Sequence, residues 1–328
     1  MVRARPDVSG LIERARDGQP RAVARLISLV EDAHPSLREV AAGLMPYTGG
    51  ARIIGLTGPP GVGKSTSTSV LLTALRGQGL RVGVLAIDPT SPFSGGALLG
   101  DRIRMTEHAT DPGVFIRSMA TRGHLGGLAW ATPQAVRVLD AAGFDVVLIE
   151  TVGVGQSEVD IVELADTTVV LLAPGMGDGV QAAKAGILEA ADVFVVNKAD
   201  RDGTDVLVRD LRHAISLAHR EVPAGAWRRP IVRTVASRGE GVDELVRVLG
   251  EHHDWLAAHG ELARRRGARA ASEIEAIAVR RIRSELVDVH GAGLPELAER
   301  VVGRALDPYA AADVLLETLR DRRSLPDV

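Results

Sequence analysis

A glycine-rich segment near residue 60 carries residue types that bind phosphate. The run GLTGPPGVGKST contains the pattern G-x-x-x-x-G-K-S, which begins at Gly58 and ends at Ser65. Such glycines let backbone N–H groups turn towards an anionic phosphate, and a helix that starts there adds its dipole. Lys64 can reach the β- and γ-phosphates of a nucleotide, and the Ser65 hydroxyl can ligate Mg²⁺. The phosphate-binding set predicted from this pattern is Gly58, Pro59, Pro60, Gly61, Val62, Gly63, Lys64 and Ser65.

The run VFVVNKADRD indicates which base accompanies the phosphates. It contains N-K-x-D, from Asn197 to Asp200. Guanine offers two adjacent donors, N1–H and the 2-amino group, and one carboxylate accepts both, whereas adenine would leave Asp200 unpaired. Lys198 can lie along the base plane, and Asn197 can tie this loop to the phosphate loop. We therefore predict a guanine nucleotide, GTP or GDP. A later segment is predicted to close over the base edge with backbone groups: Ala236, Ser237 and Arg238.

Three acids are predicted to surround the metal. Glu150 ends the apolar run VVLI and opens ETVG, which reads as a D-x-x-G element with glutamate in place of aspartate. The Gly153 N–H can then contact the γ-phosphate. Asp88 ends the run VGVLAI, and Asp101 lies in GDRIRM. With Ser65 these acids would form the Mg²⁺ neighbourhood, because Mg²⁺ prefers hard oxygen ligands. The alternative for each acid is a helix cap or turn former.

Composition narrows the class of protein. The chain has 328 residues, a formal net charge of −3 and no cysteine. Disulfides, thiolate metal sites and cysteine nucleophiles are therefore excluded. A near-neutral balance argues against a nucleic-acid partner. The first 20 residues contain no apolar signal region, and no apolar run reaches the ~18 residues that span a bilayer, so we expect a cytoplasmic protein without a membrane partner.

Short apolar runs alternate with helical patterns in the middle of the chain. This alternation predicts an α/β fold with a mostly parallel, Rossmann-like sheet, as in P-loop NTPases. Helical spacing predicts helices before and after it, with breaks at residues 18–20 and at Pro35. After the sheet, long helices are predicted from Glu251 to about Val287 and from Leu294 to about Arg320. The arginine-rich stretch ARRRGAR reads as a solvated helix face, with a site for phosphate or an acidic partner as the alternative. The predicted strands are 52–56, 81–87, 114–118, 144–149, 167–173, 193–196 and 230–236, and the predicted domains are a helical extension 1–48, a nucleotide-binding domain 49–249 and a helical arm 250–328.

Taken together, these motifs resemble the methylmalonyl-CoA mutase-associated GTPases, the MeaB/ArgK group. The resemblance rests on GLTGPPGVGKST, LAIDPTSPFSGGALLGDRIRM, RGHLGGLA, DVVLIETVGVGQSE, PGMGDGVQAAKAGI and NKAD, and it extends over most of the chain. It implies a G domain with an N-terminal helical extension and a C-terminal arm that forms a homodimer. It also implies a chaperone role for adenosylcobalamin-dependent methylmalonyl-CoA mutase, gating cofactor loading and protecting or reactivating the mutase.

The resemblance further implies that Thr66, together with Lys64 and Ser65, binds phosphate and metal. It also implies a third switch in GDGVQAAKAG. In that segment Asp178, Gln181 and Lys184 would respond to the partner enzyme and take part in catalysis with Lys64. The expected chemistry is in-line attack of water on the γ-phosphate, with the charge stabilised by Lys64, Mg²⁺ and backbone N–H groups. No arginine finger is evident, so we expect slow intrinsic turnover that a partner raises. The alternative for Lys184 is an ordinary surface lysine.

Three other readings stay open at this stage. A metallochaperone GTPase for another metalloenzyme is disfavoured because the chain has no cysteine motif or histidine-rich tract. A protein kinase is disfavoured because no HRD catalytic-loop element is present. A structural nucleotide-binding module would require that hydrolysis be absent.

Overall fold

The computed structural model describes residues 6–88, 106–108, 110–120, 131–151, 157–175, 191–218, 225–290 and 294–324. Asp101, Gly153, Asp178, Gln181 and Lys184 lie outside these residues. The chain divides into two compact units, Met1–Arg266 and Gly267–Val328. None of the described helices is long and apolar enough to cross a membrane.

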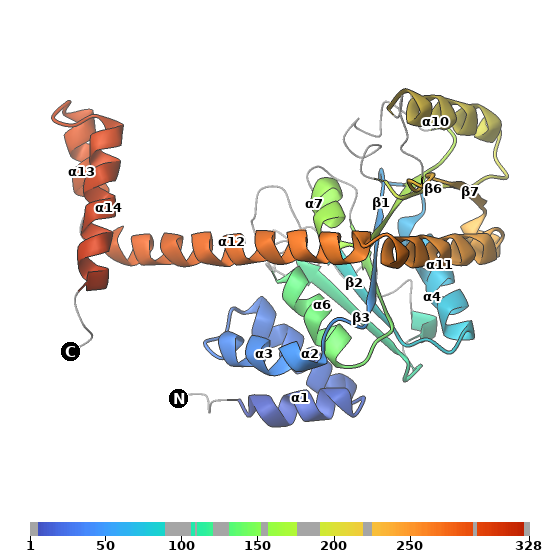
Figure 1. Cartoon of the computed structure of the whole chain (residues 1–328), viewed down its shortest axis with the longest axis horizontal. Helices are drawn as coiled ribbons and strands as arrows, with labels where there is room; N and C mark the ends of the chain where they lie inside the picture. The colour runs from blue at the N-terminus through green and yellow to red at the C-terminus, as the bar shows by residue number, and fades with distance from the viewer. Residues whose placement is uncertain are drawn as a thin grey trace. The chain divides into compact units, whose positions relative to one another are not determined.

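A seven-stranded sheet forms the centre of the first unit (Figure 1). Its strand order is β3-β2-β4-β1-β5-β6-β7, and every pairing is parallel. This confirms the predicted α/β, P-loop type of fold. Parallel strands are buried on both faces, which explains why they read as continuous apolar runs. The strands are β1 Arg52–Thr57, β2 Val82–Asp88, β3 Val114–Ala120, β4 Val146–Glu150, β5 Thr167–Leu172, β6 Val193–Asn197 and β7 Ile231–Thr234.

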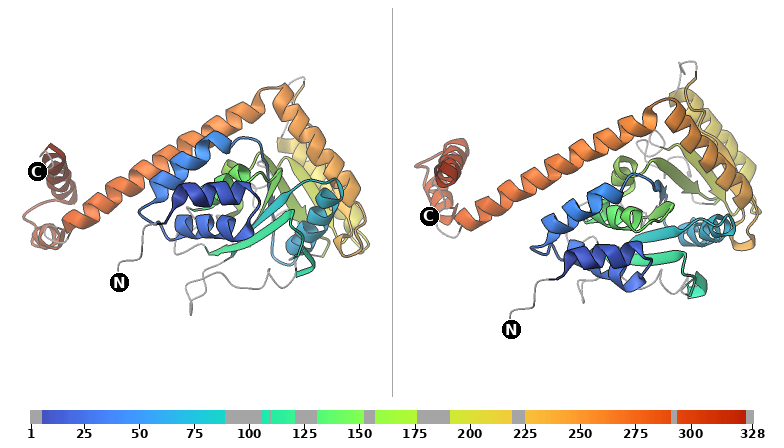
Figure 2. Two further views of the ribbon diagram at one scale, coloured as in Figure 1. Left: turned by 90° about the horizontal axis from the view of Figure 1, so that it is seen from below. Right: turned by 60° about the horizontal axis from the view of Figure 1, so that its bottom comes forward.

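Helices cover the two faces of this sheet (Figure 2). On one face the three N-terminal helices, α6 and α7 pack on alternate strand residues such as Ile53 and Val147. On the other face α4 and α11 pack on the intervening residues, such as Ile54 and Val146. The helices of this unit are α1 Val8–Arg16, α2 Pro20–Glu31, α3 Leu37–Leu44, α4 Lys64–Gly77, α6 Thr132–Ala141, α7 Ser157–Leu164, α10 Thr204–Ala218 and α11 Val242–Ala258, with short 3-10 turns at Met45–Tyr47, Thr106–His108 and Ala236–Arg238.

The C-terminal helices differ in detail from the sequence prediction. One helix was expected from Glu251 to about Val287. Instead, α11 begins at Val242 and ends before Gly260, whose φ of +70° is incompatible with a continuous helix. The helix expected from Leu294 to about Arg320 is two helices, because Arg304 has a φ of +60° and Pro308 starts a new one. The remaining helices are α12 Glu261–His290, α13 Leu294–Val302 and α14 Pro308–Ser324.

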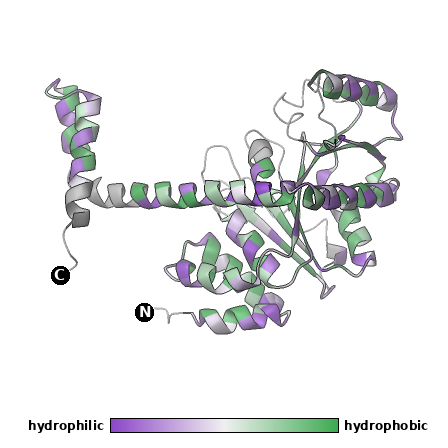
Figure 3. Ribbon diagram, in the orientation of Figure 1, coloured by the Kyte–Doolittle hydropathy of each residue, from purple (hydrophilic) through white to green (hydrophobic). Residues whose placement is uncertain are grey.

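Hydropathy follows this architecture (Figure 3). The strands are mostly hydrophobic, and all the residues of β4, β5 and β6 are buried. The predicted domain boundary at residue 250 falls inside α11, which packs its Leu245 and Leu249 against the sheet. The predicted dimerisation role of the arm stays a prediction.

Candidate nucleotide site

The phosphate loop lies between β1 and α4, and its glycines are required by geometry. Gly58 has a φ of +143°, and a Cβ there would lie 2.2 Å from the carbonyl oxygen of Leu171. Gly63 has a φ of +93° and is the N-cap of α4 in the left-handed region. A Cβ at Gly63 would lie 2.5 Å from Asn197 Nδ2. Side chains are strained or excluded at both positions. The loop therefore keeps its backbone close to β5 and to the end of β6.

The Lys64 ammonium lies inside this loop. Its Nζ donates to the carbonyl oxygens of Gly58 at 2.7 Å and Pro59 at 3.0 Å. The side chain is buried, as is that of Ser65. A buried ammonium on the concave side of a loop at a helix N-terminus favours an anion there. Thr66, in contrast, is exposed, although it lies in the same first turn of α4.

Ser65 and Glu150 meet although 85 residues separate them in the chain. The Ser65 hydroxyl donates to the Glu150 carboxylate at 2.6 Å, and Glu150 is 4% exposed at the end of β4. Two hard oxygens next to a phosphate loop fit Mg²⁺, which binds through one or two protein oxygens together with phosphate and water. Asp88 ends β2, the strand next to β4, two residues beyond Ala86, which pairs with Glu150. The Asp88 side chain lies outside the described residues.

Asn197 joins three loops at the carboxyl edge of the sheet. Its Nδ2 donates to the Val62 carbonyl at 2.8 Å, which is the tie to the phosphate loop expected from the sequence. Its Oδ1 accepts from the Ala236 N–H at 3.0 Å and from the Thr234 hydroxyl at 3.2 Å. Because Asn197 is 3% exposed, these bonds are shielded from water. The amide therefore fixes the phosphate loop relative to the base-reading loops.

The other two residues of N-K-x-D lie beside the phosphate loop. Lys198 has a φ of +57°, and its Nζ donates to the Gly61 carbonyl at 2.6 Å. Asp200 is partly exposed and lies 3.4 Å from the guanidinium of Arg238. Arg238 was expected to contribute only its backbone groups to the base site. The structure adds a contact from its side chain to Asp200. Ser237 is exposed. Ala236 is buried, and its backbone N–H donates to Asn197.

A second polar network occupies the opposite, amino ends of the strands. An aspartate precedes each of β5 and β6 and pairs with the neighbouring strand. The Ile53 N–H donates to Asp166 Oδ2 at 3.1 Å, and the Thr168 N–H donates to Asp192 Oδ2 at 2.8 Å. Asp166 is 1% exposed and Asp192 is 6% exposed. Buried carboxylates need charged partners, which the described structure supplies from α12.

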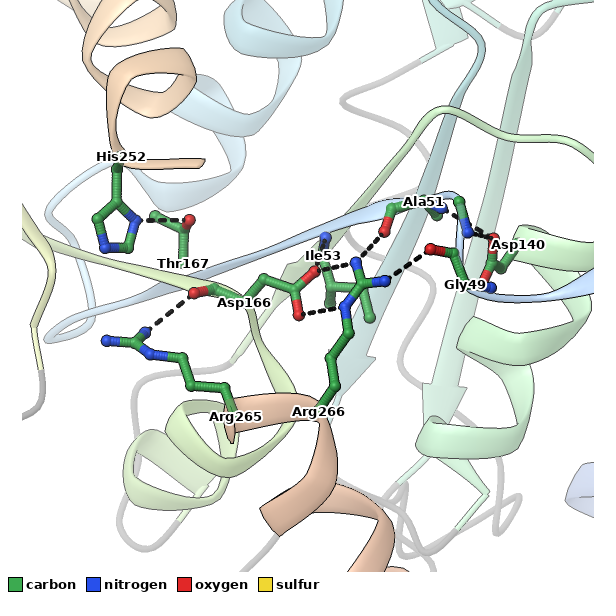
Figure 4. A network of polar contacts seen from close by, with 10 residues as sticks. Gly49, Ala51, Ile53, Asp140, Asp166, Thr167, His252, Arg265 and Arg266 are labelled. Atoms are coloured by element: carbon green, nitrogen blue, oxygen red, sulfur yellow. Dashed lines mark hydrogen bonds and ion pairs between the residues drawn. The ribbon is translucent and has the colours of Figure 1, made fainter. Parts of the chain in front are cut away.

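Arg265 and Arg266 provide that charge (Figure 4). Arg265 contacts both oxygens of Asp192 at 2.8 Å, and Arg266 contacts Asp166 Oδ2 at 2.8 Å and Oδ1 at 3.3 Å. The prediction that ARRRGAR is simply a solvated helix face is therefore wrong for these two arginines. The aspartates directly before two apolar strands were the available signal, because a charge at the entry of a buried strand needs a partner.

His252 belongs to the same network. It is fully buried; its Nδ1 lies 2.8 Å from the Thr167 hydroxyl, and its ring contacts Trp227 and Trp255. Burial lowers the His252 pKa from 6.5 to about 4, because it disfavours the charged form more than the nearby Asp192 stabilises it. The imidazole is neutral at pH 7.

The fold and the carboxyl-edge motifs define a P-loop GTPase. Residues 23–290 match the family described as methylmalonyl Co-A mutase-associated GTPase MeaB, and the chain belongs to this family.

Relatives agree with this assignment. A putative GTPase of Pyrococcus horikoshii is 50% identical over 315 residues, covering 96% of this chain and 99% of that protein. The mouse methylmalonic aciduria type A homolog, mitochondrial, is 36% identical, covering 93% of this chain and 78% of that protein. A crystal structure described as LAO/AO transport system kinase matches with a TM-score of 0.69 and 26% identity, covering 95% of this chain and 97% of that one. The protein is thus a GTPase, which hydrolyses GTP to GDP and phosphate.

Proposed function

We propose that this GTPase is a chaperone of adenosylcobalamin-dependent methylmalonyl-CoA mutase. On this proposal it gates cofactor loading and protects or reactivates the mutase. Membership of the MeaB family supports the proposal, as does the name of the mouse relative, which refers to methylmalonic aciduria. The observation that carries the GTP-dependent part is the joining of the phosphate loop and the base-reading loops by Asn197.

In this proposal the described residues divide the work at the nucleotide. Lys64 and the loop N–H groups bind the β- and γ-phosphates and stabilise charge as water attacks. Ser65 would hold Mg²⁺ directly, and Glu150 would hold it through water. The contact of 2.6 Å between their side chains supports these roles. The ion would supply charge neutralisation at the phosphates. Asp200 would accept both guanine donors, and Lys198 would lie along the base.

Partner control is assigned to residues that lie outside the described part of the chain. Slow intrinsic turnover would rise when the mutase reorders the segment with Asp178, Gln181 and Lys184, where Lys184 would add positive charge to the transition state. Replacing Lys184 by alanine should then abolish stimulation while leaving basal turnover. Stimulation that survives Lys184→Ala would remove this role.

We also propose that the second unit forms a homodimer. Several of its apolar side chains are exposed. Among its described residues only Leu297 and Ala311 are buried. Exposed apolar surface of this kind is typical of an interface. Ile274 and Ile277 are three residues apart and share one face of α12, at 69% and 51% exposure. Light scattering of Ile274→Asp/Ile277→Asp should show monomers, whereas Val206→Asp, at an equally exposed position on α10, should leave the dimer intact.

Phosphate release is the experiment that tests the main proposal. GTP and ATP would each be supplied with Mg²⁺, with and without a methylmalonyl-CoA mutase. Turnover of GTP alone that the mutase stimulates would support the proposal. Turnover of GTP that ignores the mutase would keep the GTPase and remove the partner. Equal turnover of ATP and GTP would show that Asp200 does not select guanine.

A further inference from the structure

The carboxylate proposed to read the base, that of Asp200, lies in an ion pair with the Arg238 guanidinium. Arg238 Nη2 lies 3.4 Å from Asp200 Oδ2, and Arg238 Nη1 lies 3.7 Å from Glu240 Oε1. Both partners of the Asp200 pair reach solvent, at 37% exposure for Asp200 and 61% for Arg238. The contact therefore lies at the mouth of the base site, where an incoming nucleotide would meet it.

The backbone holds Asp200 in place. Lys198 turns the chain with its positive φ, and the Arg201 N–H donates to the Lys198 carbonyl at 3.0 Å. The Thr204 hydroxyl donates to the Arg201 carbonyl at 2.8 Å. Thr204 is buried, so this bond is protected from water. Hydrogen bonds within the chain therefore fix the turn that carries the Asp200 carboxylate.

The loop that carries Arg238 is held as firmly. The Val235 N–H donates to the Glu240 carbonyl at 3.0 Å, and the Arg238 N–H donates to the Val235 carbonyl at 2.8 Å. Gly239 follows with a φ of +73°. The Ala236 bond to Asn197 then joins this loop to the Asp200 turn. Two fixed turns thus bring the guanidinium to the carboxylate.

A guanidinium and the edge of guanine present the same chemistry to Asp200. Each is a planar group with neighbouring N–H donors, and a carboxylate accepts from either. Adenine offers an acceptor at N1 and cannot replace the arginine. Guanine and Arg238 therefore compete for one carboxylate, whereas an adenine nucleotide leaves the ion pair intact.

We propose that Arg238 is a positioning residue that stabilises the empty base site and thereby speeds release of guanine nucleotide. This inference rests on the proposed role of Asp200. The ion pair replaces the lost base contacts when GDP leaves and is broken when GTP or GDP binds. It lowers affinity for guanine nucleotides without changing the phosphate contacts.

Stopped-flow fluorescence with a ribose-labelled GDP tests the proposal. Arg238→Ala should bind labelled GDP about two- to fivefold more tightly, mainly through slower release, because an exposed ion pair contributes little in water. Arg238→Lys should be intermediate. The matched control is Arg233→Ala, which removes an exposed arginine of β7 paired at 2.7 Å with Asp205 of α10 and should leave GDP binding unchanged. Unchanged or weaker binding by Arg238→Ala would overturn the proposal.

Salt dependence separates competition from a merely structural effect. The ratio of affinities between Arg238→Ala and the unmodified protein should fall towards one as salt rises from about 0.05 to about 0.5 M, because salt screens the exposed pair. Phosphate contacts cancel in this ratio. A ratio that ignores salt would contradict an ion-pair origin.

Asp200→Asn distinguishes this inference from the function on which it rests. If Asp200→Asn binds GDP as well as the unmodified protein does, the base-reading role of Asp200 is wrong, and the inference fails with it. If Asp200→Asn loses GDP binding but Arg238→Ala changes nothing, the role of Asp200 stands and the inference alone fails. Thermal unfolding of each variant shows that it is folded.

Discussion

Arg266 contacts both carboxylate oxygens of Asp166, a side chain that is 1% exposed at the entry of β5. The same guanidinium donates to the carbonyls of Gly49 at 2.6 Å and Ala51 at 2.8 Å. One side chain thus satisfies a buried charge and the chain segment that leads into β1. The start of α12 is thereby bound to the amino ends of β1 and β5, and β1 leads at its carboxyl end into the phosphate loop.

We predict that Arg266→Ala destabilises the first unit by ~3 kcal/mol, because it leaves a buried carboxylate without its charge partner. Adding Asp166→Asn should recover part of the loss, since an uncharged amide costs less to bury and can still accept from the Ile53 N–H. The control is Arg264→Ala, on the same helix in an exposed pair with Glu261, which should cost about 0.5 kcal/mol or less. Urea unfolding measures all four proteins. A loss in Arg264→Ala equal to that in Arg266→Ala would contradict the argument.

Acid should destabilise the protein through His252. Its pKa falls from 6.5 to about 4 on folding, so below pH 6.5 the unfolded chain binds a proton that the folded protein does not. Stability from this group is therefore present above pH 6.5 and is lost as pH falls, by about 2 kcal/mol between pH 7 and pH 5.

His252→Asn tests this linkage. The amide can keep a bond to Thr167 but cannot titrate, so the fall in unfolding free energy between pH 7 and pH 5 should shrink. His213→Asn, an exposed histidine on α10, should keep the full fall. An unchanged pH dependence in His252→Asn would show that other groups cause it.

Two glycines of the phosphate loop should respond differently to alanine. Both have positive φ, +143° at Gly58 and +82° at Gly61, but only Gly58 faces an atom, the Leu171 carbonyl oxygen at 2.2 Å. Gly61→Ala should cost about 1–2 kcal/mol through backbone strain alone. Gly58→Ala should cost more and abolish binding of labelled GDP, because the loop must move. Equal effects would mean that the close approach to Leu171 is unimportant.

Asn197→Ala should weaken nucleotide binding about 10- to 100-fold, because three buried hydrogen bonds that align the loops are lost. Thr234→Val removes only the longest of these bonds, at 3.2 Å, and should have a much smaller effect. Titration with labelled GDP measures both variants. If Asn197→Ala binds GDP normally, the loops are aligned by other contacts.

Local patterns were sufficient for the fold class and much of the nucleotide site. Seven apolar runs correspond to the seven strands of the sheet, because the central strands are buried on both faces and are apolar at most positions. The phosphate loop and N-K-x-D were recognisable since each is a contiguous run whose residue types follow from backbone conformation. The breaks at residues 18–20 and at Pro35 also match the gaps between α1, α2 and α3.

Contacts between distant segments needed the tertiary structure. Nothing local in ARRRGAR separates Arg264, which is exposed, from Arg265 and Arg266, which neutralise buried aspartates. Likewise, the pairing of Arg238 with Asp200 depends on two turns that only the sheet brings together. Periodicity reports which residues are apolar, but the partner of a charged side chain is chosen by strand order and by how each helix lies on the sheet.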